Sequence, residues 1–330
     1  MPSKIDNKMN ILKSPTFTEE SLEKHLSHYP NIGRVLNFKK LEGGVANVVY
    51  KIKTTKGNFV LKIVIRNNPY RVNYEVELLN KIKNLPIPKP LKARNGKFLV
   101  MYKKHQILLY PYLPGKKTEN INHKISSAVG KFLAKLHLQT RNFHSKIKRN
   151  ELYGITHSKM NHVLRARNFI INKKIKNAIT YIEKNAFKYK IDKLLPDGAM
   201  HLDIRPENVL FHNGKLTGVV DFDNSYNGPL ILDLAGALIW YSYENNEFNL
   251  KKMKQFYLGY TGTRKLSKKE KIELINMLHY YVLGIVLHGI EYYIDNKLSE
   301  QFLTKVSIGH LLEAEKKLTP IERKLSKLFK

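Results

Sequence analysis

One stretch decides the fold of this chain: Met200-His201-Leu202-Asp203-Ile204-Arg205-Pro206-Glu207-Asn208-Val209-Leu210-Phe211, which Val219-Val220-Asp221-Phe222-Asp223 soon follows. It places an Asp in a loop and an Asn five residues later, just ahead of a β-hairpin that ends in a second Asp. The hairpin is predicted by two short apolar runs that turn at His212-Asn213-Gly214-Lys215. Carboxylate and amide oxygens suit Mg²⁺, a cation that takes its remaining ligands from phosphates and water.

This spacing of acids and amide predicts phosphoryl transfer. One carboxylate orients the acceptor hydroxyl, and we assign that role to Asp203, because a loose transition state needs alignment more than a strong base. Asn208 and Asp221 are the expected Mg²⁺ ligands. Arg205 either neutralises the γ-phosphate of ATP or is a surface cation, and the sequence leaves both open. His201 is expected to support the loop by hydrogen bonding.

The composition is that of a globular enzyme. The chain has 330 residues, of which 42% are hydrophobic and 10% aromatic, enough to bury one large core or two smaller ones. The absence of cysteine excludes disulfides and thiolate zinc sites. The apolar stretches at 229–241 and 280–290 are shorter than a bilayer span, and residues 1–15 contain no apolar signal segment. We therefore expect a cytoplasmic protein without a membrane partner.

The net charge of +31, from 58 basic and 27 acidic side chains, would attract polyanions such as nucleic acid. However, the lysine pairs are scattered from Lys39-Lys40 to Lys268-Lys269 and form no arm or tail. A solvated lysine surface is the favoured interpretation, and a non-catalytic polyanion-binding module is the alternative. The sequence does not predict the oligomeric state.

Residue patterns predict a sheet-rich N-terminal part and a helical remainder. Alternating β-branched runs predict strands over 38–52, 58–65, 97–102 and 106–110. Apolar residues at helical spacing predict helices over 17–29, 71–84, 124–138, 169–190, 231–241, 251–260, 268–296 and 300–312. The expected fold is α+β with two lobes: a nucleotide-binding lobe at 1–110, a hinge at 111–116, and a catalytic and acceptor-binding lobe at 117–330.

Nucleotide-binding residues are expected in the first lobe and the hinge. Gly43, Gly44 and Asn47 lie between the first two strands, where small residues let backbone N–H groups approach phosphates, although a structural turn explains the glycines equally well. Adenine is expected to lie against the backbone near Tyr110 and Tyr112.

Lys62 is a lone lysine within the apolar strand Phe59-Val60-Leu61-Lys62-Ile63, and such a side chain needs a reason to face inward. We expect it to bind the α- and β-phosphates of ATP. Glu75 on the following helix is the preferred partner for Lys62, and Glu77 is the rival.

With these residues, the chain resembles the aminoglycoside phosphotransferase and choline kinase superfamily, and within it most closely the protein-kinase-like homoserine kinases. The similarity spans roughly residues 41–237 and includes the motifs above and the helix Gly130-Lys131-Phe132-Leu133-Ala134-Lys135-Leu136-His137. It implies a protein-kinase-like fold, ATP and Mg²⁺ as cofactors, and a small-molecule alcohol as acceptor. Homoserine is the leading acceptor; aminoglycosides, choline, sugars and, less favoured, a protein side chain are the alternatives.

Some residues depart from the homoserine kinase pattern. That group usually lacks a lysine where Lys62 stands and often has an aromatic residue where Asp223 follows Phe222. Asp223 is expected to contact the metal or the ammonium group of an acceptor, or to cap the next turn. Asp233 is expected to stabilise the catalytic loop or to cap its helix. The acceptor is expected near the helical segments that carry Tyr241, Tyr243, Glu244, His288 and Glu291.

Overall fold

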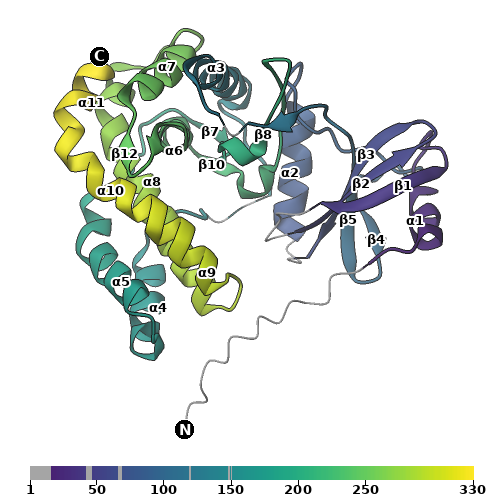
Figure 1. The fold of residues 1–330 in the computed structure, drawn as a ribbon, viewed down its shortest axis with the longest axis horizontal. Helices are drawn as coiled ribbons and strands as arrows, with labels where there is room; N and C mark the ends of the chain where they lie inside the picture. Colours follow the sequence, from purple (N-terminus) through teal and green to yellow (C-terminus); the bar gives the residue numbers. More distant parts are fainter. Residues whose placement is uncertain (1–15, 42–46, 66–68, 119, 148, 150) are drawn as a thin grey trace.

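The computed structural model has two lobes joined by a short connection (Figure 1). It describes residues 16–41, 47–65, 69–118, 120–147, 149 and 151–330. Gly43 and Gly44, two of the expected nucleotide-binding residues, lie outside the described residues.

The smaller N-lobe is built on an antiparallel sheet of five strands in the order β1-β2-β3-β5-β4. Its elements are α1 (Glu19–Leu26), β1 (Val35–Leu41), β2 (Asn47–Thr54), β3 (Gly57–Val64), α2 (Pro69–Lys81), β4 (Val100–Tyr102) and β5 (His105–Pro111). The run expected as one strand over 38–52 contributes to two, β1 and β2. Lys62 lies opposite Val49 and Leu108 in the central strand β3, which explains its burial.

The larger C-lobe is mainly helical. Its helices are α3 (His123–Thr140), α4 (His157–Ala166), α5 (Lys173–Asn185), α6 (Leu230–Ser242), α7 (Leu250–Thr261), α8 (Lys268–Ile294), α9 (Glu300–Phe302), α10 (Glu313–Leu318) and α11 (Glu322–Leu328). A π-helical segment at Leu303–Leu312 links α9 to α10. The predicted helix over 169–190 is too long, because the side chain of Asn172 caps the start of α5.

Helix α8 has 27 residues and is the one described helix long and apolar enough to cross a membrane. Its apolar window is 67% buried inside the C-lobe. This burial is typical of the core helix of a folded domain.

Short strands in the C-lobe hold the loop at residues 201–208, called the catalytic loop below because it carries Asp203 and Asn208. They are β6 (Lys116–Lys117), β7 (Asp197–Met200), β8 (Val209–His212), β9 (Lys215–Val219), β10 (Tyr226–Pro229), β11 (Tyr243–Glu244) and β12 (Glu247–Phe248). Strand β7 enters the loop and pairs with β10, while β8 and β9 form the predicted hairpin. Strand β6 pairs with β8, so the chain leaving the N-lobe after Pro111 docks directly on this hairpin.

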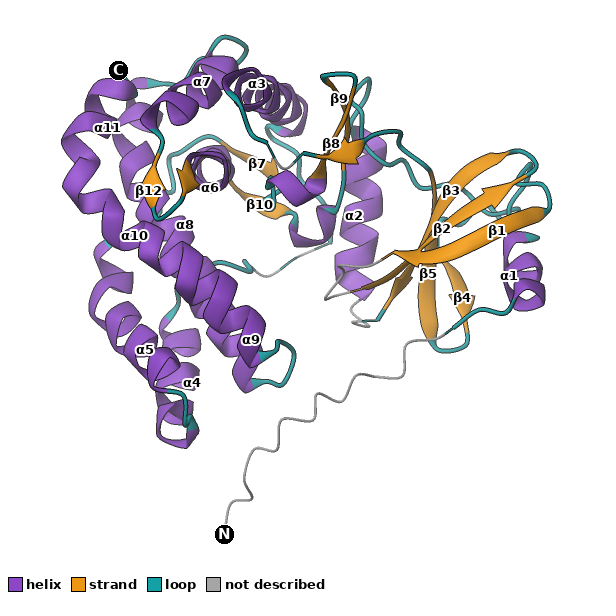
Figure 2. Ribbon diagram, in the orientation of Figure 1, coloured by secondary structure: helices purple, strands orange, loops and turns teal. Residues whose placement is uncertain are grey.

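Helix α2 connects the two lobes. Figure 2 shows it between the sheet and the C-lobe, and its residues Val72, Tyr74 and Leu79 belong to the large hydrophobic core that also contains α3, α6 and α8. A separate, smaller core lies between α1 and the sheet. Because α2 packs into the C-lobe core, its polar side chains are held against the segment that follows the β8–β9 hairpin.

Helices α3 and α7 approach closely at two glycines. A Cβ atom at Gly130 would lie 2.2 Å from the carbonyl oxygen of Phe256, and one at Gly259 would lie 2.2 Å from that of Ser127. Each helix therefore needs a glycine opposite the backbone of the other.

We expect Gly130→Ala to lower the free energy of unfolding by about 2 kcal/mol, because the added methyl group must push the two helix backbones apart. Lys131→Ala, on the exposed side of the same helix, is the control and should change it by less than about 0.5 kcal/mol. Urea unfolding measures both. Equal stability of the two variants would contradict the close packing.

Candidate active site

The catalytic loop is held in place by Asp233 of α6, a residue that is buried with 1% of its surface exposed. Its carboxylate accepts the backbone N–H groups of His201 at 2.7 Å and Leu202 at 2.8 Å, and Nε2 of His137 lies 3.0 Å from it. Leu202 has a φ of 64°, a conformation that costs a leucine about 1 kcal/mol or more. Burial raises the pKa of Asp233, but the hydrogen bonds from His137 and the loop outweigh it and hold the pKa below its ordinary value. Asp233 thus stabilises the loop, one of its two expected roles.

His201 links the loop to the end of the hairpin. Its Nδ1 accepts the N–H of Asp203 at 3.2 Å, so Nε2 carries the proton and donates to the carbonyl of Val220 at 3.1 Å. Burial lowers the pKa of His201, which favours this neutral form. The histidine therefore supports the loop by hydrogen bonding, as the sequence predicted.

Asp203 is buried, with 6% of its surface exposed. The amide nitrogen of Asn208 donates to its carboxylate at 2.9 Å, and Nε of Arg205 lies 3.3 Å from the other carboxylate oxygen. Burial raises the pKa of Asp203 to about 7, although Arg205 and the Asn208 hydrogen bond act in the opposite direction. The guanidinium of Arg205 also lies over the ring of Trp240, 5.8 Å from its centroid, so Arg205 is not a plain surface cation.

Asn208 and Asp221 flank the β8–β9 hairpin, where the backbone N–H of Val220 donates to the backbone carbonyl of Asn208 at 2.9 Å. The amide nitrogen of Asn208 is committed to Asp203, which leaves its carbonyl oxygen to act as a ligand. Asp221 is exposed and has a φ of 67°, so the chain turns sharply after it. No group of three or more His, Asp or Glu side chains within the described residues could hold a metal ion by itself. An amide and a carboxylate fit a cation that completes its coordination with phosphate oxygens.

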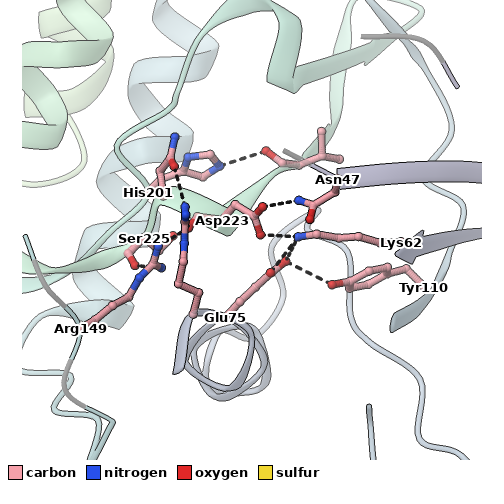
Figure 3. A network of polar contacts seen from close by, with 11 residues as sticks. Asn47, Lys62, Glu75, Tyr110, Arg149, His201, Asp223 and Ser225 are labelled. Carbon is pink, nitrogen blue, oxygen red and sulfur yellow. Dashed lines mark hydrogen bonds and ion pairs between the residues drawn. The ribbon is translucent and has the colours of Figure 1, made fainter. Parts of the chain in front are cut away.

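Lys62 joins the two lobes through ion pairs (Figure 3). Its ammonium lies 2.8 Å from Oε2 of Glu75 on α2 and 2.5 Å from Oδ1 of Asp223 in the C-lobe. The hydroxyl of Tyr110 donates to Glu75 at 3.1 Å, and the amide of Asn47 donates to Oδ2 of Asp223. Four of these five side chains come from the N-lobe, and Asp223 comes from the C-lobe.

The charges in this cluster favour an ionised lysine. Burial lowers the pKa of Lys62, but the carboxylates of Asp223 and Glu75 outweigh burial and hold the pKa well above its ordinary value. Burial also raises the pKa of Glu75, while Lys62 holds that of Asp223 below its usual range against the effect of burial. Phosphates that bind Lys62 must therefore compete with Asp223.

One alternative left open by the sequence is settled by these contacts. Lys62 pairs with Glu75, whereas Glu77 accepts the hydroxyl of Ser145 instead. The carboxylate of Asp223 binds Lys62 and Asn47, two partners that the sequence did not predict, and its expected contact with a metal or an acceptor ammonium group stays a prediction.

The remaining nucleotide-binding candidates lie along β5 and its end. The side chain of Tyr110 is buried against Glu75, so only its backbone is available to a base. The backbone N–H of Tyr112 donates to Asn58, and the ammonium of Lys51 lies 3.9 Å from the centroid of the Tyr112 ring. Two surface hollows, of about 240 Å³ beside α1 and about 450 Å³ near the start of α8, lie away from these residues.

The expected acceptor region divides into two parts. The rings of Tyr241 and Tyr243 are buried against Phe256 and Phe248, and their hydroxyls have no hydrogen-bond partner among the described residues. Glu244 pairs with Lys252 at 2.6 Å. The ring of His288 packs edge-on against Tyr153 and tilted against Tyr292, and Oε2 of Glu291 lies 3.3 Å from its Nδ1. Only this second part lies near the segment that follows Asp221.

Two arginines that no sequence motif predicts lie in this neighbourhood. Arg71 on α2 donates to the backbone oxygen of Asp223 at 3.0 Å and to the side chain of Asn224 at 3.2 Å. Arg149, after α3, donates to the carbonyls of Asp223 and Ser225. Neither arginine stands in a motif, and among 58 basic residues nothing in the sequence distinguishes them.

The small sheet-based lobe carries a paired lysine, and the helical lobe carries a loop Asp, an Asn and a second Asp. This combination is typical of ATP-dependent, protein-kinase-like phosphotransferases. The chain belongs to the phosphotransferase enzyme family, whose model matches residues 37–266. It is similar to the homoserine kinase of Zymomonas mobilis, at 28% identity over 82% of this chain and 85% of the relative. The homoserine kinase of Bradyrhizobium diazoefficiens is 29% identical over 77% of this chain and 79% of its own length.

Solved structures confirm the expected two-lobed, protein-kinase-like α+β fold. An amicoumacin kinase in complex with AMP-PNP and Ca²⁺ superposes with a TM-score of 0.67 at 20% identity, covering 92% of this chain and 94% of that one. A spectinomycin phosphotransferase in complex with ADP superposes with a TM-score of 0.64 at 18% identity, covering 96% and 98%. Together with the family match and the homoserine kinase relatives, this makes the chain an ATP-dependent kinase that phosphorylates the hydroxyl of a small molecule.

The role of Asp233 gives a stability prediction. Asp233→Ala should lower the free energy of unfolding by about 3 kcal/mol, because two backbone N–H groups and His137 lose a buried, charged acceptor. Asp192→Ala is the matched control, since Asp192 pairs with Lys269 at the surface. Chemical denaturation at neutral pH measures both, and a loss below about 1 kcal/mol for Asp233→Ala would show that the loop does not depend on this carboxylate.

Proposed function

We propose that this protein transfers the γ-phosphate of Mg²⁺-bound ATP to the side-chain hydroxyl of homoserine in the cytoplasm. The observation that carries the proposal is the buried Asp203 carboxylate, which Asn208 and Arg205 orient. The similarity to homoserine kinases, which extends over most of the length of those relatives, supports it. Residues 1–110 would form the nucleotide-binding lobe, 111–116 the hinge and 117–330 the catalytic and acceptor-binding lobe.

The nucleotide would bind between the lobes. Lys62 would bind its phosphates in exchange for Asp223, with Gly43, Gly44 and Asn47 close to the same phosphates. Adenine would lie against the backbone from Tyr110 to Tyr112.

The metal would be Mg²⁺, bound by Asn208 and Asp221. When bound, it neutralises charge that develops on the β- and γ-phosphates. The two residues supply the hard oxygens that this ion prefers, and the fixed amide of Asn208 ties the metal position to the carboxylate of Asp203.

In the transfer step, the acceptor oxygen bonds to the γ-phosphorus while the bond from phosphorus to the bridging oxygen breaks, and ADP leaves with that electron pair. Asp203 orients the attacking hydroxyl and receives its proton. Arg205, beside Asp203, would stabilise negative charge on the transferred group.

A different small alcohol is the alternative acceptor. Lys62 and Asp223 stand where homoserine kinases usually have other residues, and both take part in the central ion-pair cluster. A panel of homoserine, choline, methylthioribose and aminoglycosides at constant ATP tests this directly. Homoserine should give the highest kcat/KM, and a higher value for another alcohol would replace it as the substrate.

Asp203→Asn should lower kcat for the preferred acceptor by about 10³-fold or more while changing ATP affinity little, because the amide keeps the shape but cannot accept the hydroxyl proton. Asp192→Asn at the surface is the matched control and should retain full activity. Steady-state kinetics and nucleotide titration measure the two effects. Turnover of Asp203→Asn close to that of the control would remove Asp203 from the mechanism.

The pH dependence follows from the raised pKa of Asp203, which is about 7. The active form is the carboxylate, so it is lost as the pH falls below this value. We expect kcat/KM for ATP, which reports the free enzyme, to fall about tenfold per pH unit below pH 7. Because Arg205 lowers this pKa, Arg205→Met should move the inflection to higher pH. A profile that stays flat to pH 5 would contradict this assignment.

A further inference from the structure

Two arginines from different lobes meet at one backbone oxygen. Arg71 of α2 and Arg149 of the segment after α3 both donate to the carbonyl of Asp223, and Arg149 also donates to the carbonyl of Ser225. Figure 3 shows Arg149 beside Ser225, on the other side of the Asp223 backbone from Lys62. The carboxylate of Asp223 points away from the arginines, toward Lys62 and Asn47.

This arrangement places two partly buried guanidinium groups of like charge close together. Burial, and next the neighbouring Arg71, lower the pKa of Arg149 to about 10. Among the described residues, Arg149 forms no ion pair with a carboxylate, and its Nε has no hydrogen-bond partner. A buried guanidinium is stable when an anion accepts its remaining hydrogens, and here the neighbouring acceptors are neutral carbonyls.

A short chain of contacts connects the arginine pair to the catalytic loop. The side-chain oxygen of Asn224 accepts Arg71, and its amide donates to the hydroxyl of Tyr153 at 3.2 Å. The ring of Tyr153 packs edge-on against that of Tyr281, at 5.7 Å, and the hydroxyl of Tyr281 donates to Leu202, which precedes Asp203. Burial, and after it Tyr281 and Asp203, raise the pKa of Tyr153, so this side chain lies between the carboxylate of Asp203 and the arginine pair.

We infer that Arg149, with Arg71, binds the carboxylate of the acceptor, so that the enzyme selects hydroxy acids over alcohols that lack a carboxylate. The planar guanidinium offers paired N–H groups that match a carboxylate. This inference rests on the proposed function, because homoserine carries such a carboxylate. The nucleotide phosphates are assigned to the Lys62 side of Asp223, which leaves the arginine side for the acceptor.

The test compares L-homoserine with 3-amino-1-propanol, the same molecule without its carboxylate. The wild type should prefer homoserine, and Arg149→Met should lower kcat/KM for homoserine by about 100-fold, chiefly through KM. The value for 3-amino-1-propanol and KM for ATP should each change by no more than about threefold. Arg149→Lys, which keeps the charge but loses the paired donors, should give an intermediate loss on homoserine.

Arg167→Met is the control, since Arg167 pairs with Glu183 at the surface, and it should keep the full preference for homoserine. The ratio of the two kcat/KM values does not depend on how much of a variant is folded, so a general loss of stability leaves it unchanged. Equal losses on both acceptors would show that Arg149 only supports the backbone at 223–225, and would overturn the inference. A raised KM for ATP with an unchanged ratio would assign the arginines to the nucleotide and overturn it as well.

A failure of the proposed function is recognised separately, before any variant is made. A wild type that phosphorylates 3-amino-1-propanol or an aminoglycoside but not homoserine would overturn both the function and the carboxylate site. The carboxylate site alone would be overturned if the wild type phosphorylates homoserine and Arg149→Met keeps the same preference for homoserine over 3-amino-1-propanol.

Discussion

The ion pair between Lys62 and Asp223 is the contact on which the rest of the site depends. It joins the central strand of the N-lobe sheet to the segment that follows the β8–β9 hairpin, and Glu75 of α2 completes it. A buried ammonium needs such partners, because an unpaired charge away from water is costly. The same carboxylates hold Lys62 in its charged form at the junction of the lobes. The N-lobe is thereby aligned with the catalytic loop through the group that is proposed to bind phosphate.

The geometry of the catalytic loop is fixed by hydrogen bonds to its buried polar atoms. Asp233 accepts two backbone N–H groups, His201 bridges the loop to Val220, and Asn208 fixes the carboxylate of Asp203. Asp203 differs from these groups, because burial raises its pKa and so destabilises its charged carboxylate form. Such a poorly solvated carboxylate is typical of a functional group kept at some cost in stability.

The sequence predicted the parts of the structure that depend on periodicity and local spacing. The helices α3, α6 and α8 and the β8–β9 hairpin follow from patterns within one segment. The pair of Lys62 with Glu75 joins two neighbouring elements, an apolar strand that contains one lysine and the helix that follows it. Strand β7, which is Asp197-Gly198-Ala199-Met200, escaped prediction because four residues with a glycine carry no alternation. Asp223 and the two arginines could not be placed either. Their contacts arise from the sharp turn at Asp221 and from segments far apart in the chain.

A crystal structure with a non-hydrolysable ATP analogue, Mg²⁺ and homoserine would reveal all three proposed binding sites at once. The phosphates should lie at Lys62, the metal between Asn208 and Asp221, and the hydroxyl of homoserine within hydrogen-bonding distance of Asp203. A nucleotide bound elsewhere, or a metal and acceptor hydroxyl remote from the catalytic loop, would contradict this mechanism.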